Sequence, residues 1–531
     1  MKIKYIFLII AIASFAGISI IHLVNHKTKN NKIKILSQNM HELPKAEFAT
    51  EFADWEFLKT RDPETNSIPE NIKGRELAFA STIPSKENQY KSNFLLGSKT
   101  LIQTQPWTNR GPSNIAGRIL AIAFDNQNEN IMLAGSASGG LWRSTDKGLS
   151  WVKATPPNVI QSVTCMAQDK RTGKTNTWYY GTGELLSTTD RKVNTLPRTI
   201  GIGDGIFKST DDGLTWIQLP STKTSSPGQL SNSFQGIWNI VTDYNNQNAD
   251  IVYAACYGGI LRSSDGGTSW TNVLGDINNK SFSTDIVITS KGVLYAALST
   301  FTVNGSKPQK TGIYRSNDGM IWTNITPTNF PTSYRTIKLA LAPSNEKVLY
   351  VLTEKAGTNS IQEFYSPSAY TFWKFTYNDM AGTGTWLNRT SYMPGKGTNY
   401  TSYLDLNTLG GYAMKVKVKP DDENVVYIGG TSLYVSRNGY TTDTSYVSIG
   451  GYPYGFTREE LHPDMHAIEF LPSNPNRVYI GNDGGIQLTD SSLAGNIIWL
   501  NVNNALLTTQ FYSVSINHKI NGDQAIFGGL Q

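Results

Sequence analysis

A short turn-forming pattern occurs four times along this chain of 531 residues. The copies read RSTDKGLSW at 143–151, KSTDDGLTW at 208–216, RSSDGGTSW at 262–270 and RSNDGMIW at 315–322. A protein needs a catalytic serine or carboxylate once, whereas a motif that recurs in this way is typical of a repeated structural unit. The pattern therefore predicts a repeat protein and not four active sites.

Each motif belongs to a longer unit of four strand-like segments. In the last unit these are HAIEFLP, RVYIG, IQLTD and IIWLNV, and the turn SNPN and the corner NDGG separate the first three. A similar turn rich in Asn, Asp or Pro recurs before β-branched runs, and such clusters mark turns between strands. The units begin near residues 118, 160, 235, 283, 335, 412 and 464. Four-stranded units repeated about every 40 to 60 residues are typical of a β-propeller.

The composition also favours many short strands, because charged residues make up 17% of the chain and there are 47 glycines. We expect an all-β fold: a β-propeller of seven four-stranded repeats and a partial eighth, preceded by a short helical segment. The segments FYSVSINHK and QAIFGGLQ supply the partial eighth repeat, and the Trp-Thr-Asn at 107–109 resembles the start of a fourth strand. Either the ring closes imperfectly with seven or eight blades, or the chain is the front portion of a longer protein, which we favour.

The repeated motifs are expected to be structural. Their Asp carboxylate and Ser hydroxyl can accept hydrogen bonds from backbone N–H groups of the turn, the Gly permits a positive φ, and the Trp covers the blade edge. The SRNG at 436–439 looks like a decayed copy. The positions with this predicted role are Ser144, Asp146, Gly148, Trp151, Ser209, Asp211, Gly213, Trp216, Ser263, Asp265, Gly267, Trp270, Ser316, Asp318 and Trp322.

The N-terminal part divides into two segments before the propeller at 106–531. Lys2 and Lys4 precede twenty largely apolar residues at 5–24, which indicate an export signal that is either cleaved or kept as a membrane anchor. We therefore predict a secreted or cell-surface protein that contacts the membrane only through residues 1–24. The segment 25–105 is predicted to contain an amphipathic helix, whose apolar positions are Phe48, Phe52, Trp55 and Leu58.

Charge and cysteine content limit the function classes. The net charge of +6 is spread along the chain without Lys/Arg runs, so it does not predict a nucleic-acid partner. Cys165 and Cys256 are the only cysteines, too few for a disulfide scaffold. They are predicted to be buried free thiols, with a single bridge as the alternative.

The topology predicts which face carries function. Because strands alternate in direction, the third-to-fourth and first-to-second turns share one face, and the second-to-third corners and the links between blades share the other. The second face also carries the long insertions 181–204, 300–311 and 388–411. Loops on a rigid scaffold and the mouth of a central channel are common binding sites, so we expect the ligand there.

Several polar residues are expected at this mouth. In HPDMH, alternation puts His462, Asp464 and His466 on one side of the seventh first strand, where they could bind a divalent metal, contact a ligand or lock a loop. No other cofactor is predicted. Arg118 and Tyr257 complete the predicted ligand-binding set. The weak candidates for glycosidic acid/base catalysis are Glu184, Asp204 and Asp483.

From residue 107 onward the chain resembles the bacterial Asp-box (BNR repeat) propellers, which include sialidase-like, sortilin-like and xyloglucanase-like proteins. The segments WTNRGPSNIAGRI, SGGLWRSTDKGLSW, YYGTGE, GIFKSTDDGLTW and NDGGI carry the resemblance. It implies the propeller fold, whereas the motifs of the enzymes match poorly: Arg118 is followed by Ile119 and Leu120 where a sialidase has Arg-Ile-Pro. The Asp-Gly-Gly at 483–485 only faintly resembles the Asp-(Ile/Val)-Gly-Gly of a xyloglucan hydrolase.

These observations predict a non-catalytic propeller that binds a polysaccharide or an extracellular protein at the mouth opposite the repeated motifs. One alternative is a glycoside hydrolase of the xyloglucanase or sialidase-like type that needs a missing C-terminal part. Another is a structural cell-surface module.

Overall fold

The computed structural model describes Leu58, 61–82 except 68, 70 and 71, and 112–530 with gaps. The gaps are 157–158, 186–200, 225–229, 277, 303–306, 356–369, 395–405, 443–444, 453–460, 496 and 517–525. The chain divides into two compact units, Met1–Thr60 with Thr189–Arg191 and Arg61–Thr188 with Lys192–Gln531. Apart from Leu58, everything described below lies in the second unit.

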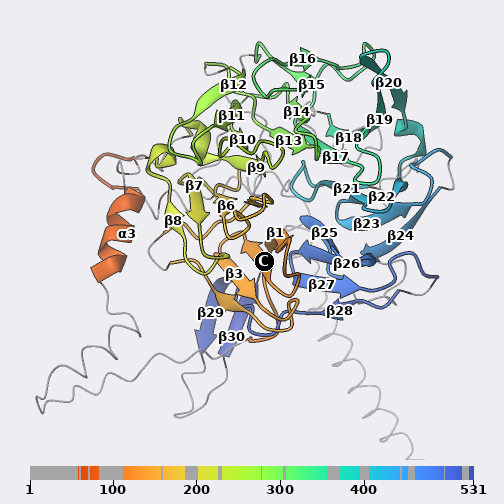
Figure 1. The fold of residues 1–531 in the computed structure, drawn as a ribbon. Coiled ribbons are helices and arrows are strands. Elements are labelled where there is room, and N and C mark those ends of the chain that lie inside the picture. Colours follow the sequence, from red (N-terminus) through yellow and green to blue (C-terminus); the bar gives the residue numbers. More distant parts are fainter. Residues whose placement is uncertain are drawn as a thin grey trace, which may run out of the picture. The chain divides into compact units, whose positions relative to one another are not determined.

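The described residues form seven four-stranded antiparallel sheets and one two-stranded sheet. Each four-stranded sheet takes its strands from consecutive chain segments, so the strand order in space follows the order in sequence. Figure 1 shows these sheets as blades around a common centre, with the first strand of each blade innermost. The predicted all-β propeller with seven four-stranded repeats is confirmed.

The first four blades contain sixteen strands. Their bounds are β1 Ile119–Phe124, β2 Met132–Ser136, β3 Leu141–Ser144 and β4 Val152–Lys153; β5 Cys165–Gln168, β6 Trp178–Gly181, β7 Ile206–Ser209 and β8 Ile217–Gln218; β9 Ile237–Thr242, β10 Val252–Cys256, β11 Gly259–Ser263 and β12 Thr271–Gly275; and β13 Thr284–Ile288, β14 Leu294–Leu298, β15 Gly312–Ser316 and β16 Thr323–Asn324.

The other three blades contain twelve strands. Their bounds are β17 Thr336–Leu341, β18 Val348–Glu354, β19 Tyr370–Asn378 and β20 Thr383–Asn388; β21 Lys415–Lys419, β22 Asp422–Gly429, β23 Ser432–Ser436 and β24 Tyr446–Gly451; and β25 Ala467–Leu471, β26 Asn474–Asn482, β27 Gly485–Thr489 and β28 Leu500–Asn501.

The remaining elements are few. The α-helix α3 spans Ile72–Thr82, and three short 3₁₀ helices span Pro220–Thr222, Ser233–Gln235 and Thr390–Tyr392. The predicted helix around 48–58 falls outside the described residues except for Leu58, which is helical. The predicted partial eighth repeat is a hairpin of β29 (Phe511–Ile516) and β30 (Ile526–Leu530), which pair only with each other. Within the described ranges, no helix has the length and apolar character needed to cross a bilayer.

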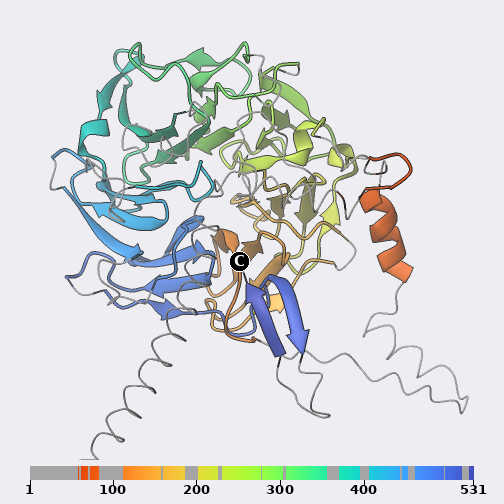
Figure 2. The same cartoon turned by 180° about the vertical axis from the view of Figure 1, so that it is seen from behind.

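The ring closes between the seventh blade, which is blue in Figure 2, and the first blade, which is orange. One apolar cluster contains residues of both blades, including Ile119, Trp151, Tyr479 and Val502. The indole Nε1 of Trp151 donates a hydrogen bond to the carbonyl of Val502 at 2.8 Å. The strands of these seven blades lie between residues 119 and 501 of the described chain.

The repeated motifs form turns between the third and fourth strands of their blades. In the third blade, Oγ of Ser263 accepts a hydrogen bond from the Gly267 N–H at 2.8 Å and donates one to Asp265 at 2.7 Å. The same Asp265 oxygen accepts from the Ser269 N–H at 2.9 Å, and Gly267 has a φ of +97°. The degenerate copy at Ser436 makes a similar turn, in which the Tyr440 N–H donates to its hydroxyl at 2.9 Å.

The side chains of these turns are occupied by their own backbone, as the sequence predicts. Two of the four tryptophans, Trp151 and Trp216, are buried, whereas Trp270 and Trp322 are half-buried. Cys165 and Cys256 are both buried and unpaired with each other, which confirms the prediction of free thiols.

Candidate functional site

Six polar residues from four blades meet at one mouth of the central channel. We name them the mouth cluster: Arg118, Glu184, Tyr412, Asp464, His466 and Asp483. They lie at the starts of first strands or at the ends of second strands, since Arg118 directly precedes β1, His466 directly precedes β25 and Asp483 directly follows β26. The repeated turns lie at the other ends of these antiparallel strands. The predicted separation of the two faces is therefore confirmed.

Arg118 is the centre of the mouth cluster. Its Nη1 lies 2.6 Å from Oε1 of Glu184, its Nε lies 3.4 Å from Oδ1 of Asp483, and its guanidinium carbon lies 4.8 Å from the ring centroid of Tyr412. Burial alone would lower the pKa of Arg118, but the neighbouring Glu184, Tyr412 and Asp483 raise it above its ordinary value. The side chain is only 9% exposed, so it acts as a fixed positive charge between blades.

Asp483 accepts contacts on both oxygens. The Tyr412 hydroxyl lies 2.9 and 2.8 Å from them, and Nε2 of His466 lies 2.7 Å from Oδ1. An ionised Asp483 therefore requires the proton of His466 to be on Nε2. Burial would raise the pKa of Asp483, but the hydrogen bond and charge of His466 and the charge of Arg118 bring it below its ordinary value. Asp483 is thus an anion held by three side chains.

Asp464 differs from Asp483 in its surroundings. Its φ of +69° is uncommon for a residue with a Cβ, although Asp tolerates it better than most. Its Oδ1 is buried and has no hydrogen-bond partner among the described residues. Burial, then the negative charge of Asp483, raise the pKa of Asp464 to about 7, and Arg118 opposes the shift. At neutral pH, Asp464 is therefore a carboxyl group that can keep its proton.

Tyr412 directly follows the insertion 388–411 and was not itself among the predicted site residues. Gly411, directly before it, has a φ of +85°, and a Cβ there would lie 2.2 Å from Oγ1 of Thr336. Beside this loop, Oγ1 of Thr408 donates to Glu354 at 3.2 Å. Burial raises the pKa of Glu354 to about 7, opposed by Arg335 and the bond from Thr408. The only signal in the sequence was the pair of glycines before Tyr412, which marks a loop that excludes larger residues.

The structure brings together five of the predicted site residues: Arg118, Glu184, Asp464, His466 and Asp483. The other three lie apart from this network. Oδ1 of Asp204 accepts from the N–H of Thr224 at 2.7 Å, so it fixes a loop. Tyr257 is buried in an apolar cluster with Leu185 and Phe282, apart from the mouth cluster.

The predicted metal ligands do not converge. His462 is exposed, and its Nδ1 lies 3.1 Å from the carbonyl of Pro463, whereas Nε2 of His466 faces Asp483. The part of the chain that the structure describes contains no group of three or more His, Cys, Asp or Glu side chains that could hold a metal ion. His462, Asp464 and His466 therefore do not form the predicted ligand set.

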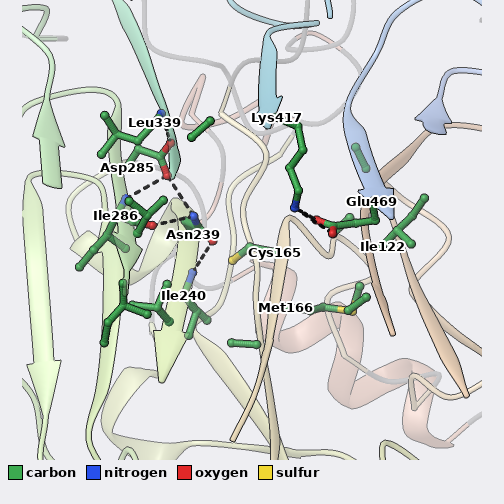
Figure 3. A pocket seen from close by; sticks show the side chains of 18 of the residues that line it. Ile122, Cys165, Met166, Asn239, Ile240, Asp285, Ile286, Leu339, Lys417 and Glu469 are labelled. Atoms are coloured by element: carbon green, nitrogen blue, oxygen red, sulfur yellow. Dashed lines mark hydrogen bonds and ion pairs between the residues drawn. The ribbon is translucent and has the colours of Figure 1, made fainter. Parts of the chain in front are cut away.

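The channel behind the mouth cluster contains a cavity of about 530 Å³. Residues from the first strands of all seven blades line it, and His466 belongs to both the cavity wall and the mouth cluster. Figure 3 shows two polar contacts across this space: Lys417 faces Glu469, and Asn239 reaches Asp285. The mouth and the cavity are thus adjacent polar environments.

Comparison with known proteins supports the propeller fold. No family model matches the chain. A curated xyloglucanase from Paenibacillus sp. is 25% identical over 228 residues, which are 30% of this chain and 21% of that protein. The crystal structure of a GH74 xyloglucanase from Xanthomonas campestris has a TM-score of 0.51 at 16% identity and covers 76% of this chain and 56% of that one. A structure of YCF48 bound to D1 peptide has a TM-score of 0.42 at 15% identity, covering 72% of this chain and 98% of that one.

The chain therefore spans less than two thirds of both xyloglucanases to which it is similar. The likeness to the solved xyloglucanase concerns the fold, and the similar sequence segment covers about a third of the present chain.

Proposed function

We propose that this chain is an exported β-propeller that binds a polysaccharide at the mouth of its channel, without turning it over. An extracellular protein is the alternative ligand. The observation that carries the proposal is Asp464, whose buried Oδ1 lacks a partner among the described residues and whose pKa is raised to about 7. Such a carboxyl can donate or accept a hydrogen bond, which suits the hydroxyl groups of a sugar.

The surroundings of Asp464 favour binding. Buried polar groups are nearly always hydrogen-bonded, so a partnerless oxygen at a channel mouth is a position where a ligand atom supplies the missing contact. Arg118 and Asp483 are already paired with protein groups and provide a rigid polar floor. The exposed imidazole of His462 lies two residues from Asp464 and adds a second group that a ligand can reach.

Asp483 argues against turnover. A catalytic base or nucleophile needs an oxygen that can approach the substrate, whereas both oxygens of Asp483 contact Tyr412 and one also contacts His466. The choice of a polysaccharide draws on the similarity to proteins named xyloglucanases, whose named substrate is a polysaccharide.

The proposal is tested by screening the purified chain on a glycan array that includes xyloglucan, and by measuring the affinity for any hit by calorimetry. We expect Asp464→Asn to weaken binding by up to about tenfold, since a typical neutral hydrogen bond contributes roughly 0.5–1.5 kcal/mol. Asp212→Asn is a matched control: Asp212 has a positive φ of 59° in a repeated turn on the opposite face. Equal affinity of both variants for the hit would refute the proposal.

A glycoside hydrolase is the second candidate, and one observation favours it. Asp464 and Asp483 have pKa values shifted in opposite directions, as the proton donor and the anionic partner of an acid/base pair require. Release of reducing sugar from xyloglucan, lost in both Asp464→Asn and Asp483→Asn, would establish this function.

The place of action follows from the same proposal. The apolar stretch at 5–24 supports export, and the four repeated turns support a relation to the Asp-box propellers. Detection of the protein on the cell surface or in the medium tests the first statement. A chain that is exported but silent in both glycan binding and sugar release would instead be a structural surface module.

A further inference from the structure

Two lysines of neighbouring blades line the channel cavity without a carboxylate partner. Lys338 lies on β17 of the fifth blade, and Lys415 begins β21 of the sixth. Lys338 is 8% exposed, and its Nζ lies 5.5 Å from the ring centroid of Trp238. The two ammonium groups are close enough for Lys338 to lower the pKa of Lys415. Like charges inside a cavity repel each other more strongly than in water.

Asp285, the carboxylate that most opposes the lowered pKa of Lys415, is already hydrogen-bonded. Asp285 accepts hydrogen bonds on Oδ1 from the Asn239 side chain at 3.0 Å and from the Ile286 N–H at 2.9 Å, and on Oδ2 from the Leu339 N–H at 3.0 Å. Figure 3 shows the Asn239 and Ile286 contacts across neighbouring first strands. Asp285 therefore acts as a clamp between blades, and it forms no ion pair with Lys338 or Lys415 among the described residues.

A third lysine of the same cavity, Lys417, is paired with a carboxylate of the protein. Nζ of Lys417 lies 2.8 Å from both oxygens of Glu469. Lys417 and Lys415 belong to the same strand and are separated by one residue, so both face the same side of β21. One lysine of this side thus has its counter-ion in the protein, and the other does not.

We propose that the channel binds a compact oxyanion, a carboxylate, sulfate or phosphate group, between Lys338 and Lys415. The ammonium groups supply charge-assisted hydrogen bonds from two blades, and the anion removes their mutual repulsion. The cavity of about 530 Å³ accommodates such a group with its hydration water. This site is independent of ligand binding at Asp464.

The site should respond to pH. Burial, then Lys338, lower the pKa of Lys415 to about 8, while Asp285, Cys165 and Glu469 oppose the shift. Burial raises the pKa of the Cys165 thiol to about 12, so that group stays neutral over the relevant range. Anion affinity should therefore fall as pH rises through about 8, because Lys415 loses its proton.

Equilibrium dialysis of the full chain with radiolabelled sulfate, at constant ionic strength set with sodium chloride, tests the proposal. We expect saturable binding of about one sulfate per chain, and at least tenfold weaker binding in Lys338→Met and in Lys415→Met, each of which removes one charge-assisted contact. Lys415→Arg should retain binding. Lys347→Met is the matched control, since Lys347 is exposed and pairs with Asp379 at 2.7 Å.

Competition with phosphate, acetate and glucuronate distinguishes a free inorganic anion from the carboxylate of an acidic sugar. Unsaturable binding, or equal binding in all variants, would mean an adventitious ion only and would overturn the proposal. If a methionine variant does not fold, the rate of chemical acetylation of Lys415 is measured instead in the unaltered chain, with and without sulfate. Sulfate should slow this reaction at least severalfold, and an unchanged rate would also overturn the proposal. Glycan binding that depends on Asp464 can succeed or fail without affecting these results.

Discussion

Nη1 of Arg118 lies 2.6 Å from Oε1 of Glu184, and the two side chains are 9% and 12% exposed. Arg118 belongs to the start of the first blade, whereas Glu184 follows the second strand of the second blade. The Arg118 side chain also approaches Asp483 of the seventh blade. The contact of Arg118 with Asp483 therefore lies where the two ends of the ring meet, whereas its ion pair with Glu184 joins the first blade to the second.

Arg118→Met should lower the free energy of unfolding by about 3 to 5 kcal/mol, because it leaves Glu184 buried without its counter-ion. Urea denaturation measures this change. The additional substitution Glu184→Gln should recover part of the loss. Arg477→Met is the control: the side chains of Arg477 and Asp490 are 30% and 51% exposed, so the expected change is below about 1 kcal/mol. Similar losses in both single variants would contradict the interpretation.

Asp464 should make stability depend on pH. Its pKa is raised from 3.8 to about 7, so the native state keeps a proton that the unfolded chain has already released in this interval. The contribution of Asp464 to the free energy of unfolding must then fall as pH rises from about 4 to about 7. Asp464→Asn removes this contribution, so its stability relative to the unaltered chain should increase over the same interval.

Glu354→Gln provides a parallel measurement, since burial raises the pKa of Glu354 from 4.5 to about 7. Urea denaturation at several values between about pH 4 and pH 8 follows both variants. A constant stability difference across the interval would show that the carboxyl concerned ionises normally in the folded protein.

Ser263→Ala should destabilise the third blade by about 1 to 3 kcal/mol, because the buried Gly267 N–H loses its acceptor and the Asp265 carboxylate loses a donor. Ligand binding at the opposite face should not change. Thr268→Ala in the same turn should alter stability by less than about 0.5 kcal/mol, since Thr268 is exposed. Thermal unfolding of the two variants, together with the glycan-binding measurement, separates a structural role from a ligand-binding one.

Gly117→Ala should destabilise the ring closure. A Cβ at this position would lie 2.4 Å from the carbonyl oxygen of Thr508, whose hydroxyl accepts the Gly117 N–H at 2.9 Å. The backbone must shift, and overpacking of this kind costs about 1 to 3 kcal/mol. Gly495→Ala is the matched control because a Cβ there meets nothing within 4 Å. Equal unfolding midpoints for the two variants would rule out tight packing at Gly117.

The propeller was predictable because its repeats carry local signals. The expected start at 283 is one residue before β13, and the expected start at 412 is three residues before β21. Within the repeats, the turn-forming residues set these boundaries. The helix α3 was missed for the opposite reason: it has no acidic residue in its first turn and no basic residue in its last.

The mouth cluster was predictable in part, because topology alone decides which strand ends share a face. That argument places Arg118, Glu184 and Asp483 on the same face, but it does not give the distances between their side chains. It cannot find Tyr412, which follows a long insertion, or predict that Tyr257 turns into an apolar cluster. The unpaired state of Lys415 was equally inaccessible, because it depends on side chains from other blades.

The junction between the last blade and the first is expected to form late in folding. Strands within a blade are neighbours in sequence, so their pairing needs only short loops to close. The bond from Trp151 to Val502 joins residues 351 positions apart in the first and seventh blades, and the chain of the five blades between them must be brought into the ring before it can form. Transient separation of the first and seventh blades would open the ring. The cavity lysines Lys338 and Lys415 and the mouth cluster would then become exposed to solvent together.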